Sequence, residues 1–189
     1  MDSATLTEEI RSIGAQTGVD ALGFAAATPF SDYRWTDSPR RDPALSLSGA
    51  RALIVGAVYI GGLALPAWED SAYGRTSRLY LSGFFLDVVT PLAPIADHLR
   101  SQGHRAIICD GSTAGASVLP LKLAAVRAGL GWQGKHSLLI SKTFGSFMAL
   151  GGIITDADLS VTQQQEPNRC KTCDKCQHAC PVGALEHPH

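Results

Sequence analysis

The feature that most constrains this chain is a cluster of cysteines near its end. Four of the five cysteines fall within one short segment, at Cys170, Cys173, Cys176 and Cys180. Thiolates at i, i+3 and i+6 can each reach a different iron of one small cluster, while a fourth in C-x3-C-P spacing points elsewhere. The motif CKTCDKCQHACP therefore predicts a [4Fe-4S] cluster. A zinc site is the alternative, although zinc sites usually combine two separated cysteine pairs.

Counting ligands raises a difficulty, because the fourth cysteine of this motif normally serves the other cluster of a two-cluster ferredoxin fold. Either the natural protein continues beyond His189, which we favour, or a single cluster takes a ligand of another kind. That ligand would be solvent, the isolated Cys109 or a nearby histidine, namely His178, His187 or His189. Cys109 ends a predicted buried strand and is more simply explained as a core thiol.

Composition places the rest of the chain among soluble folded proteins. The 189 residues are 45% hydrophobic and 17% charged, as expected for one domain with an appendage. The net charge of -1 removes any bulk electrostatic attraction to nucleic acid or to an anionic membrane. An acidic N-terminus without an apolar signal region, and apolar runs too short to span a bilayer, predict a cytoplasmic protein.

The hydrophobic pattern predicts an α/β body over residues 1–160, with a mixed central sheet flanked by helices, and an iron-sulfur segment over 161–189. The strand at 51–60 is apolar on both faces and should be central. Helices are expected at 5–16, starting at a capping box, at 119–129, and over 75–103, where Pro91 and Pro94 require a kink or two helices. Further strands are expected at 21–27, 105–110, 137–141 and 147–156, the last with a bulge at its glycine pair.

Several stretches, RRDPALSLSGARALIVGAVYI, AAVRAGLGWQGKHSLLISKTFGSFMALGGIITD and CKTCDKCQHACPVGAL, resemble the epoxyqueuosine reductase family. The resemblance implies a nitroreductase-like core with a ferredoxin-like C-terminal segment, and a cobalamin-dependent reductase related to reductive dehalogenases. A cluster would deliver electrons to the corrinoid, with flavin the less favoured cofactor. By position the resemblance also implies that the corrinoid is bound by Arg41, Arg78, Gly131, Gly134, Lys135, His136 and Ser137, with Lys135 at a phosphate or propionamide edge.

The residues specific to the family's reaction do not match. The family's proton-donating aspartate falls on Gly115, and its Asp-Tyr-His signature appears as Phe84-Phe85-Leu86. Asp110 is the nearest acid and could replace the aspartate only if the loop 110–118 folds back over the site; otherwise it belongs to an ordinary Asp-Gly turn. We therefore expect a relative that does not reduce epoxyqueuosine.

Two functional hypotheses follow. The first is an oxidoreductase, an iron-sulfur reductase acting on an unidentified small molecule. The second is an electron-transfer protein, or a corrinoid or flavin carrier, that serves a redox partner protein and has no substrate pocket of its own. Neither hypothesis includes a nucleic-acid or membrane partner, and both leave a homodimer open.

Overall fold

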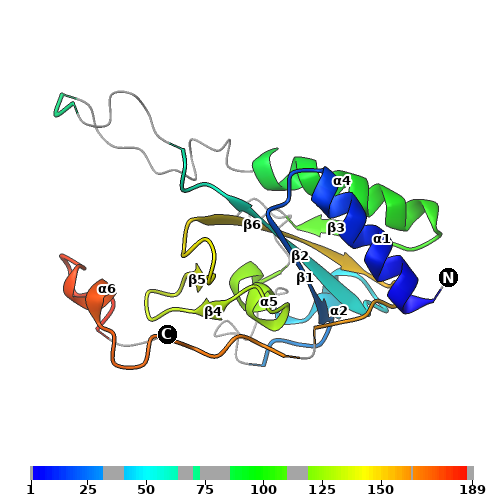
Figure 1. The fold of residues 1–189 in the computed structure, drawn as a ribbon. Helices are drawn as coiled ribbons and strands as arrows, with labels where there is room; N and C mark the ends of the chain where they lie inside the picture. Colours follow the sequence, from blue (N-terminus) through cyan, green and yellow to red (C-terminus); the bar gives the residue numbers. More distant parts are fainter. Residues whose placement is uncertain are drawn as a thin grey trace.

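The computed structural model describes residues 2–31, 41–63, 70–72, 86–109, 119–162 and 164–186, with only the backbone at 86 and 87. Its centre is a four-stranded sheet in the order β1-β2-β6-β3 (Figure 1). The strands are β1 (Ala21–Ala26), β2 (Ala52–Tyr59), β3 (Ala106–Cys109) and β6 (Met148–Thr155). A separate two-stranded hairpin is formed by β4 (Trp132–Gln133) and β5 (Leu139–Ile140). The predicted body of helices packed on a central sheet is thus confirmed.

The sheet is antiparallel at every described strand pair, where the sequence predicted a mixed sheet. Strands β2 and β3 run in the same direction, as in a parallel strand-helix-strand unit. They are not neighbours, however, because β6 lies between them and is antiparallel to both. The predicted central place of β2 is confirmed, since β1 and β6 pair with it on either side.

Helices cover both faces of this sheet, as the apolar character of β2 predicted (Figure 1). On one face, α1 (Ser3–Gln16) and α4 (Leu86–Ser101) form a core around Ile10, Ile54, Leu92, Ile95 and Ile153. On the other face, α5 (Leu121–Arg127) forms a second core around Phe30, Leu53, Leu119, Ala124 and Ile154. The two cores are separate but share the residues of one sheet.

The glycine pair of β6 is not a bulge. Gly151 pairs with Gly56 and Gly152 pairs with Val55 in an unbroken register along the two strands. A Cβ atom on Gly151 would lie 2.3 Å from Cγ1 of Val88 in α4, and one on Gly56 would lie 2.8 Å from Cδ2 of Leu92. The glycines are therefore required by the close approach of α4 to the sheet rather than by strand irregularity.

The helix boundaries differ from the predicted ones, with α5 shorter at both ends than the predicted 119–129 and with larger differences at α1 and α4. Helix α1 begins at Ser3 because the carboxylate of Asp2 caps it, accepting a hydrogen bond from the Thr5 amide at 2.8 Å. The predicted capping box at Thr5 is therefore one turn inside the helix. Helix α4 is one helix that contains both Pro91 and Pro94, and the earlier part of its predicted range, 75–85, lies outside the described residues.

Two short helices complete the described fold, α2 (Pro43–Ser46) and α6 (Lys175–His178). The predicted strand at 147–156 corresponds to β6, whereas only the two residues of β5 form from the predicted strand at 137–141. None of the helices in the described ranges is long and apolar enough to cross a membrane.

Candidate functional site

The cysteine segment, residues 170–186, follows an extended stretch of chain that leaves the body, and it contains the short helix α6 (Figure 1). The amide of Cys173 donates to the carbonyl of Cys170 at 2.6 Å, which closes a turn containing Lys171 at a φ of 40°. The amide of Cys170 donates to Oδ1 of Asn168 at 2.9 Å. All four cysteines of the segment are free thiols at least partly open to solvent. The backbone thus presents them on a short, surface-lying loop.

Backbone amides surround the last of these thiols. The amide of Ala184 donates to Sγ of Cys180 at 3.3 Å, within a turn that places Gly183 at a φ of 64°. The amides of Val182 and Ala184, in that order, lower the pKa of Cys180 below its ordinary value because they stabilise the thiolate. A thiolate held by N–H donors is the form in which cysteine binds iron.

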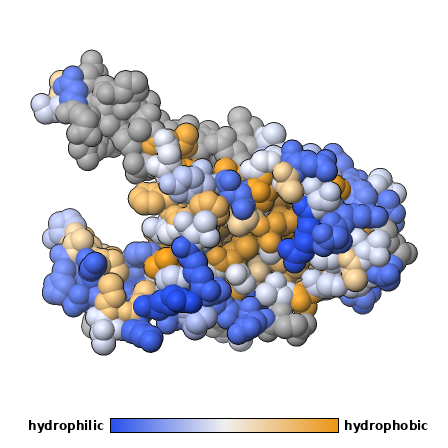
Figure 2. Space-filling view, in the orientation of Figure 1, coloured by the Kyte–Doolittle hydropathy of each residue, from blue (hydrophilic) through white to orange (hydrophobic). Residues whose placement is uncertain are grey.

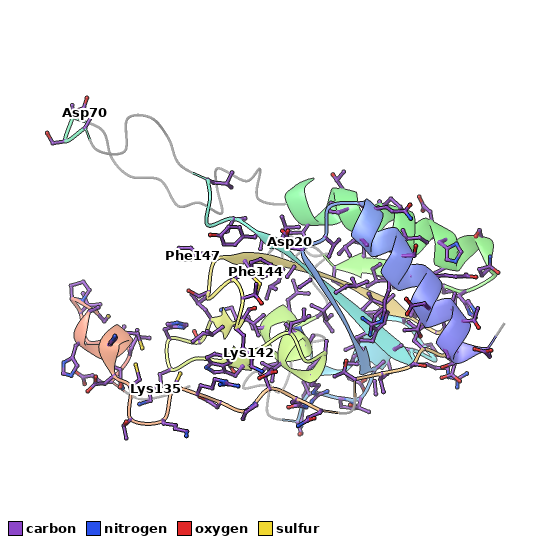
Figure 3. All side chains as sticks on the ribbon, in the orientation of Figure 1. Asp20, Asp70, Lys135, Lys142, Phe144 and Phe147 are labelled. Carbon is purple, nitrogen blue, oxygen red and sulfur yellow. The ribbon has the colours of Figure 1, made fainter. Side chains whose placement is uncertain are left out.

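A loop of the body, residues 131–138, holds the cysteine segment. The Lys135 amine donates to the carbonyl of Cys173 at 2.8 Å, and Figure 3 shows Lys135 beside the segment that leads to α6. In the opposite direction, Nδ2 of Asn168 donates to the carbonyl of Gln133 at 3.1 Å. The glycine-rich motif and the cysteine motif, which are distant in sequence, therefore meet in space.

The glycines of this loop have a packing reason that the sequence did not show. A Cβ on Gly131 would lie 2.1 Å from the carbonyl oxygen of Ile140, and one on Gly134 would lie 2.7 Å from Cδ1 of the same residue. Ser137 adopts a φ of 61°, and Nδ1 of His136 accepts a hydrogen bond from the Leu138 amide at 3.1 Å. The loop is a tight, internally bonded turn, and its predicted role in binding a cofactor stays a prediction.

A second attachment lies just before the cysteines. Lys142, in the turn between β5 and β6, donates to Oε1 of Glu166 at 2.7 Å, and Arg169 lies 3.7 Å from the other carboxylate oxygen. The hydrogen bond from Lys142 is the main cause that lowers the pKa of Glu166 below its ordinary value. These contacts place the start of the cysteine segment along the β4–β5 hairpin.

The four cysteine thiols are suitable ligands for an iron-sulfur cluster, although they do not lie close together in the structure. Across the described residues, no three His, Cys, Asp or Glu side chains lie close enough together to hold a metal ion. The indole Nε1 of Trp132, in the loop that contacts the segment, is buried without a hydrogen-bond acceptor. A buried N–H without a partner costs about 1–3 kcal/mol, and an acceptor on a bound group would remove that cost.

The other predicted site residues either lie away from the loop 131–138 or fall outside the described residues. Arg41 lies one residue before Asp42, the N-cap of α2, and α2 lies well apart from α6 in Figure 1. Arg78 and Asp110 lie outside the described residues, as does Gly115. Cys109 is fully buried in the second core, as expected of a core thiol.

An exposed apolar patch is the part of the surface that the sequence reasoning missed. Its members are Tyr59 (44% exposed), Phe147 (48%) and Phe144, whose ring lies 5.4 Å from that of Tyr59. Figure 3 shows Phe144 and Phe147 on the side of the body toward α6, and Figure 2 shows the surface recessed between the body and the α6 segment. The repeated phenylalanines of FGSF were the only sequence signal for it.

Comparisons with known proteins agree with this architecture. No family model matches the chain. An epoxyqueuosine reductase from Gloeobacter violaceus is 34% identical over 171 residues, covering 88% of this chain and 51% of that protein. The crystal structure of an epoxyqueuosine reductase with a modified tRNA stem loop has a TM-score of 0.76 at 23% identity, covering 97% of this chain and 54% of that one. A reductive dehalogenase with B12-dependent dehalogenation has a TM-score of 0.75 at 20% identity, covering 97% and 26%.

The fold is therefore that of a class of proteins which includes epoxyqueuosine reductases and reductive dehalogenases. Within that class, the chain belongs to an epoxyqueuosine reductase-like family. The matches cover most of this chain, but the chain spans only about half the length of those relatives.

Proposed function

We propose that this chain is the cluster-binding, cofactor-facing part of an iron-sulfur oxidoreductase. The observation that carries the proposal is the CKTCDKCQHACP spacing on a segment hydrogen-bonded to the body. Cys170, Cys173 and Cys176 would hold a [4Fe-4S] cluster, and Cys180 would be a ligand of this or a second cluster. A bound cluster supplies one-electron transfer. The body positions the segment, and the likeness to epoxyqueuosine reductases supports the reductase class.

The exposed apolar patch supports a second cofactor of the corrinoid type. Large apolar side chains at a recessed surface are typical of a binding site rather than of free solvent-facing surface. The reductive dehalogenase with the same fold carries out B12-dependent chemistry. Hydroxocobalamin should therefore change its visible spectrum on titration with this protein, and Phe147→Ser should weaken that binding. Binding of flavin but not of hydroxocobalamin would contradict the corrinoid assignment.

The substrate is proposed to differ from epoxyqueuosine, because Gly115 stands where the family has its proton-donating aspartate. A glycine has no group that can donate a proton to a reacting centre. The net charge of -1 also predicts no bulk attraction to tRNA, in contrast to the relative solved with a stem loop. Retention of a modified stem loop by this protein at physiological salt would contradict this part of the proposal.

Metal analysis tests the central claim. Protein purified without oxygen should be brown and contain iron and acid-labile sulfide. Cys173→Ser should lose most of both, because it removes one of three consecutive ligands. Cys109→Ala is the matched control and should keep its iron, since Cys109 is buried in the core. Colourless anoxic protein with stoichiometric zinc would overturn the iron-sulfur assignment.

An electron-transfer or carrier protein is the second candidate, favoured by the same glycine at position 115. Such a protein would hold the cluster and pass electrons to a partner without converting a substrate. Iron-loaded protein that binds neither hydroxocobalamin nor flavin would favour this candidate over the reductase.

A further inference from the structure

Cys173 of the cysteine segment is bound to the body by the cation of Lys135. Nζ of Lys135 donates to the carbonyl of Cys173 at 2.8 Å, across 38 positions of sequence. The carbonyl that accepts from Lys135 belongs to the same residue as one of the thiols proposed to bind the cluster. Just before the cysteines, the bond from Asn168 to the carbonyl of Gln133 at 3.1 Å and the ion pair between Lys142 and Glu166 at 2.7 Å add two further contacts.

Lys135 stands on a turn that limits where its amine can go. The amide of Gly134 donates to the carbonyl of Leu138 at 2.9 Å, and the amide of Ser137 donates to the carbonyl of Gly134 at 2.8 Å. The hairpin around this turn cannot open easily, because Gly131 packs directly on the backbone of Ile140. The amine is thus presented from the body and not from the mobile end of a free loop.

The ammonium of Lys135 is bound to a carbonyl rather than to a carboxylate. In the described part of the chain, Lys135 forms no ion pair, whereas Arg169 lies beside Glu166 at 3.7 Å and Asp174 beside His178 at 3.0 Å. The ammonium of Lys135 is therefore directed at the carbonyl of Cys173, while the carboxylate of the next residue, Asp174, pairs with His178.

We infer that Lys135 is a positioning residue that docks the cysteine segment on the β4–β5 hairpin and raises the reduction potential of a cluster bound there. The inference rests on the proposed iron-sulfur function. Reduction adds one negative charge to a cluster, and a fixed positive charge nearby favours that state by Coulomb attraction. Net charge and hydrogen bonding around the cluster are general determinants of iron-sulfur potentials.

The docking half of the inference can be tested without any cluster. In metal-free protein, Lys135→Met should increase amide hydrogen exchange in a peptide covering residues 164–178 several-fold, because it removes the cross-contact at Cys173 and leaves only those made by Glu166 and Asn168. Lys135→Arg keeps a cationic donor and should exchange close to the wild-type rate. Exchange of this peptide unchanged by Lys135→Met would overturn the docking role.

The electrostatic half is tested by a redox titration of anaerobically loaded protein, monitored by electron paramagnetic resonance. Lys135→Met should shift the cluster's reduction potential to a more negative value at unchanged iron and sulfide content, and Lys135→Arg should restore it. Lys122→Met removes the same charge from an exposed position on α5 and should leave the potential at the wild-type value. Equal potentials in Lys135→Met and Lys122→Met would overturn the inference, whereas wild-type protein without iron would refute the proposed function itself.

Discussion

At the residue scale, Gly131, Gly134 and Lys135 show that a sequence motif does not predict which residues its members contact. Gly131 and Gly134 fall in a cofactor-lining motif of the family that the chain resembles, but in the structure both are required by packing against Ile140. Lys135 was expected to meet a cofactor edge, and its amine has a partner within the protein. Chemistry at one residue is predictable from its type, whereas its partner depends on the tertiary fold.

Gly151, which pairs with Gly56 across the strands beneath α4, leads to a stability prediction. Gly151→Ala should lower the free energy of unfolding by about 1–3 kcal/mol, because the new methyl group would overlap Val88 and force the helix or strand to shift. Urea unfolding followed by circular dichroism measures this. Gly62→Ala is the matched control, with nothing within 4 Å of its added Cβ. Equal unfolding midpoints for the two variants would contradict the packing account.

At the element scale, the placement of β6 between β2 and β3 is what the sequence did not predict. Each strand was recognisable from its apolar, β-branched residues, but its neighbours in the sheet were not. One long-range contact reinforces the edge pairing. Arg105, just before β3, donates through its backbone amide and Nε to both carboxylate oxygens of Asp156, just after β6, at 2.8 and 2.7 Å.

This contact makes part of the stability depend on pH. Desolvation of Asp156 acts to raise its pKa, but the hydrogen bonds from Arg105 outweigh it, so the pKa lies below the ordinary value of 3.8. A lowered pKa means that the stabilisation is present above pH 3.8 and is lost as the pH falls through the folded-state pKa. Asp156→Asn should therefore destabilise the protein by about 1 kcal/mol at neutral pH and by less in acid.

Urea unfolding at neutral pH and near pH 3 measures both values. Asp158→Asn is the control. It breaks the pair with Arg51, in which both side chains are mostly exposed, and should have little effect at either pH. A difference between wild type and Asp156→Asn that grows on acidification would contradict the assigned sign.

At the scale of the whole molecule, one sheet separates two hydrophobic cores and belongs to both. Ile54 of β2 contributes to the first core, and its neighbour Leu53 to the second. Because every central strand supplies alternate residues to the two faces, neither core can persist without the sheet. We expect the body to unfold as a single unit.

Cys109 provides a probe of this coupling. In a variant with serine at the four clustered cysteines, the buried Cys109 thiol reports on the second core through its reaction with a thiol reagent. Leu92→Ala removes a fully buried side chain from the first core and should cost about 2–5 kcal/mol. In Leu92→Ala, the urea concentration at which half of the Cys109 thiol reacts should fall by the same amount as the unfolding midpoint measured by circular dichroism. Exposed Leu45→Ala should shift neither, and a fall in the circular dichroism midpoint alone would contradict a single cooperative unit.

The sequence alone was enough to predict the types of element and the buried central strand, and the iron-sulfur chemistry of the cysteine segment stays a prediction from it. These follow from periodicity and ligand spacing, which are local properties. The three-dimensional structure was needed to show three further features. Strand β6 lies between β2 and β3, Gly56 and Gly151 allow the close approach of α4, and Lys135 donates a hydrogen bond to the carbonyl of Cys173. Each of these depends on contacts between residues far apart in the chain, which local periodicity and spacing do not specify.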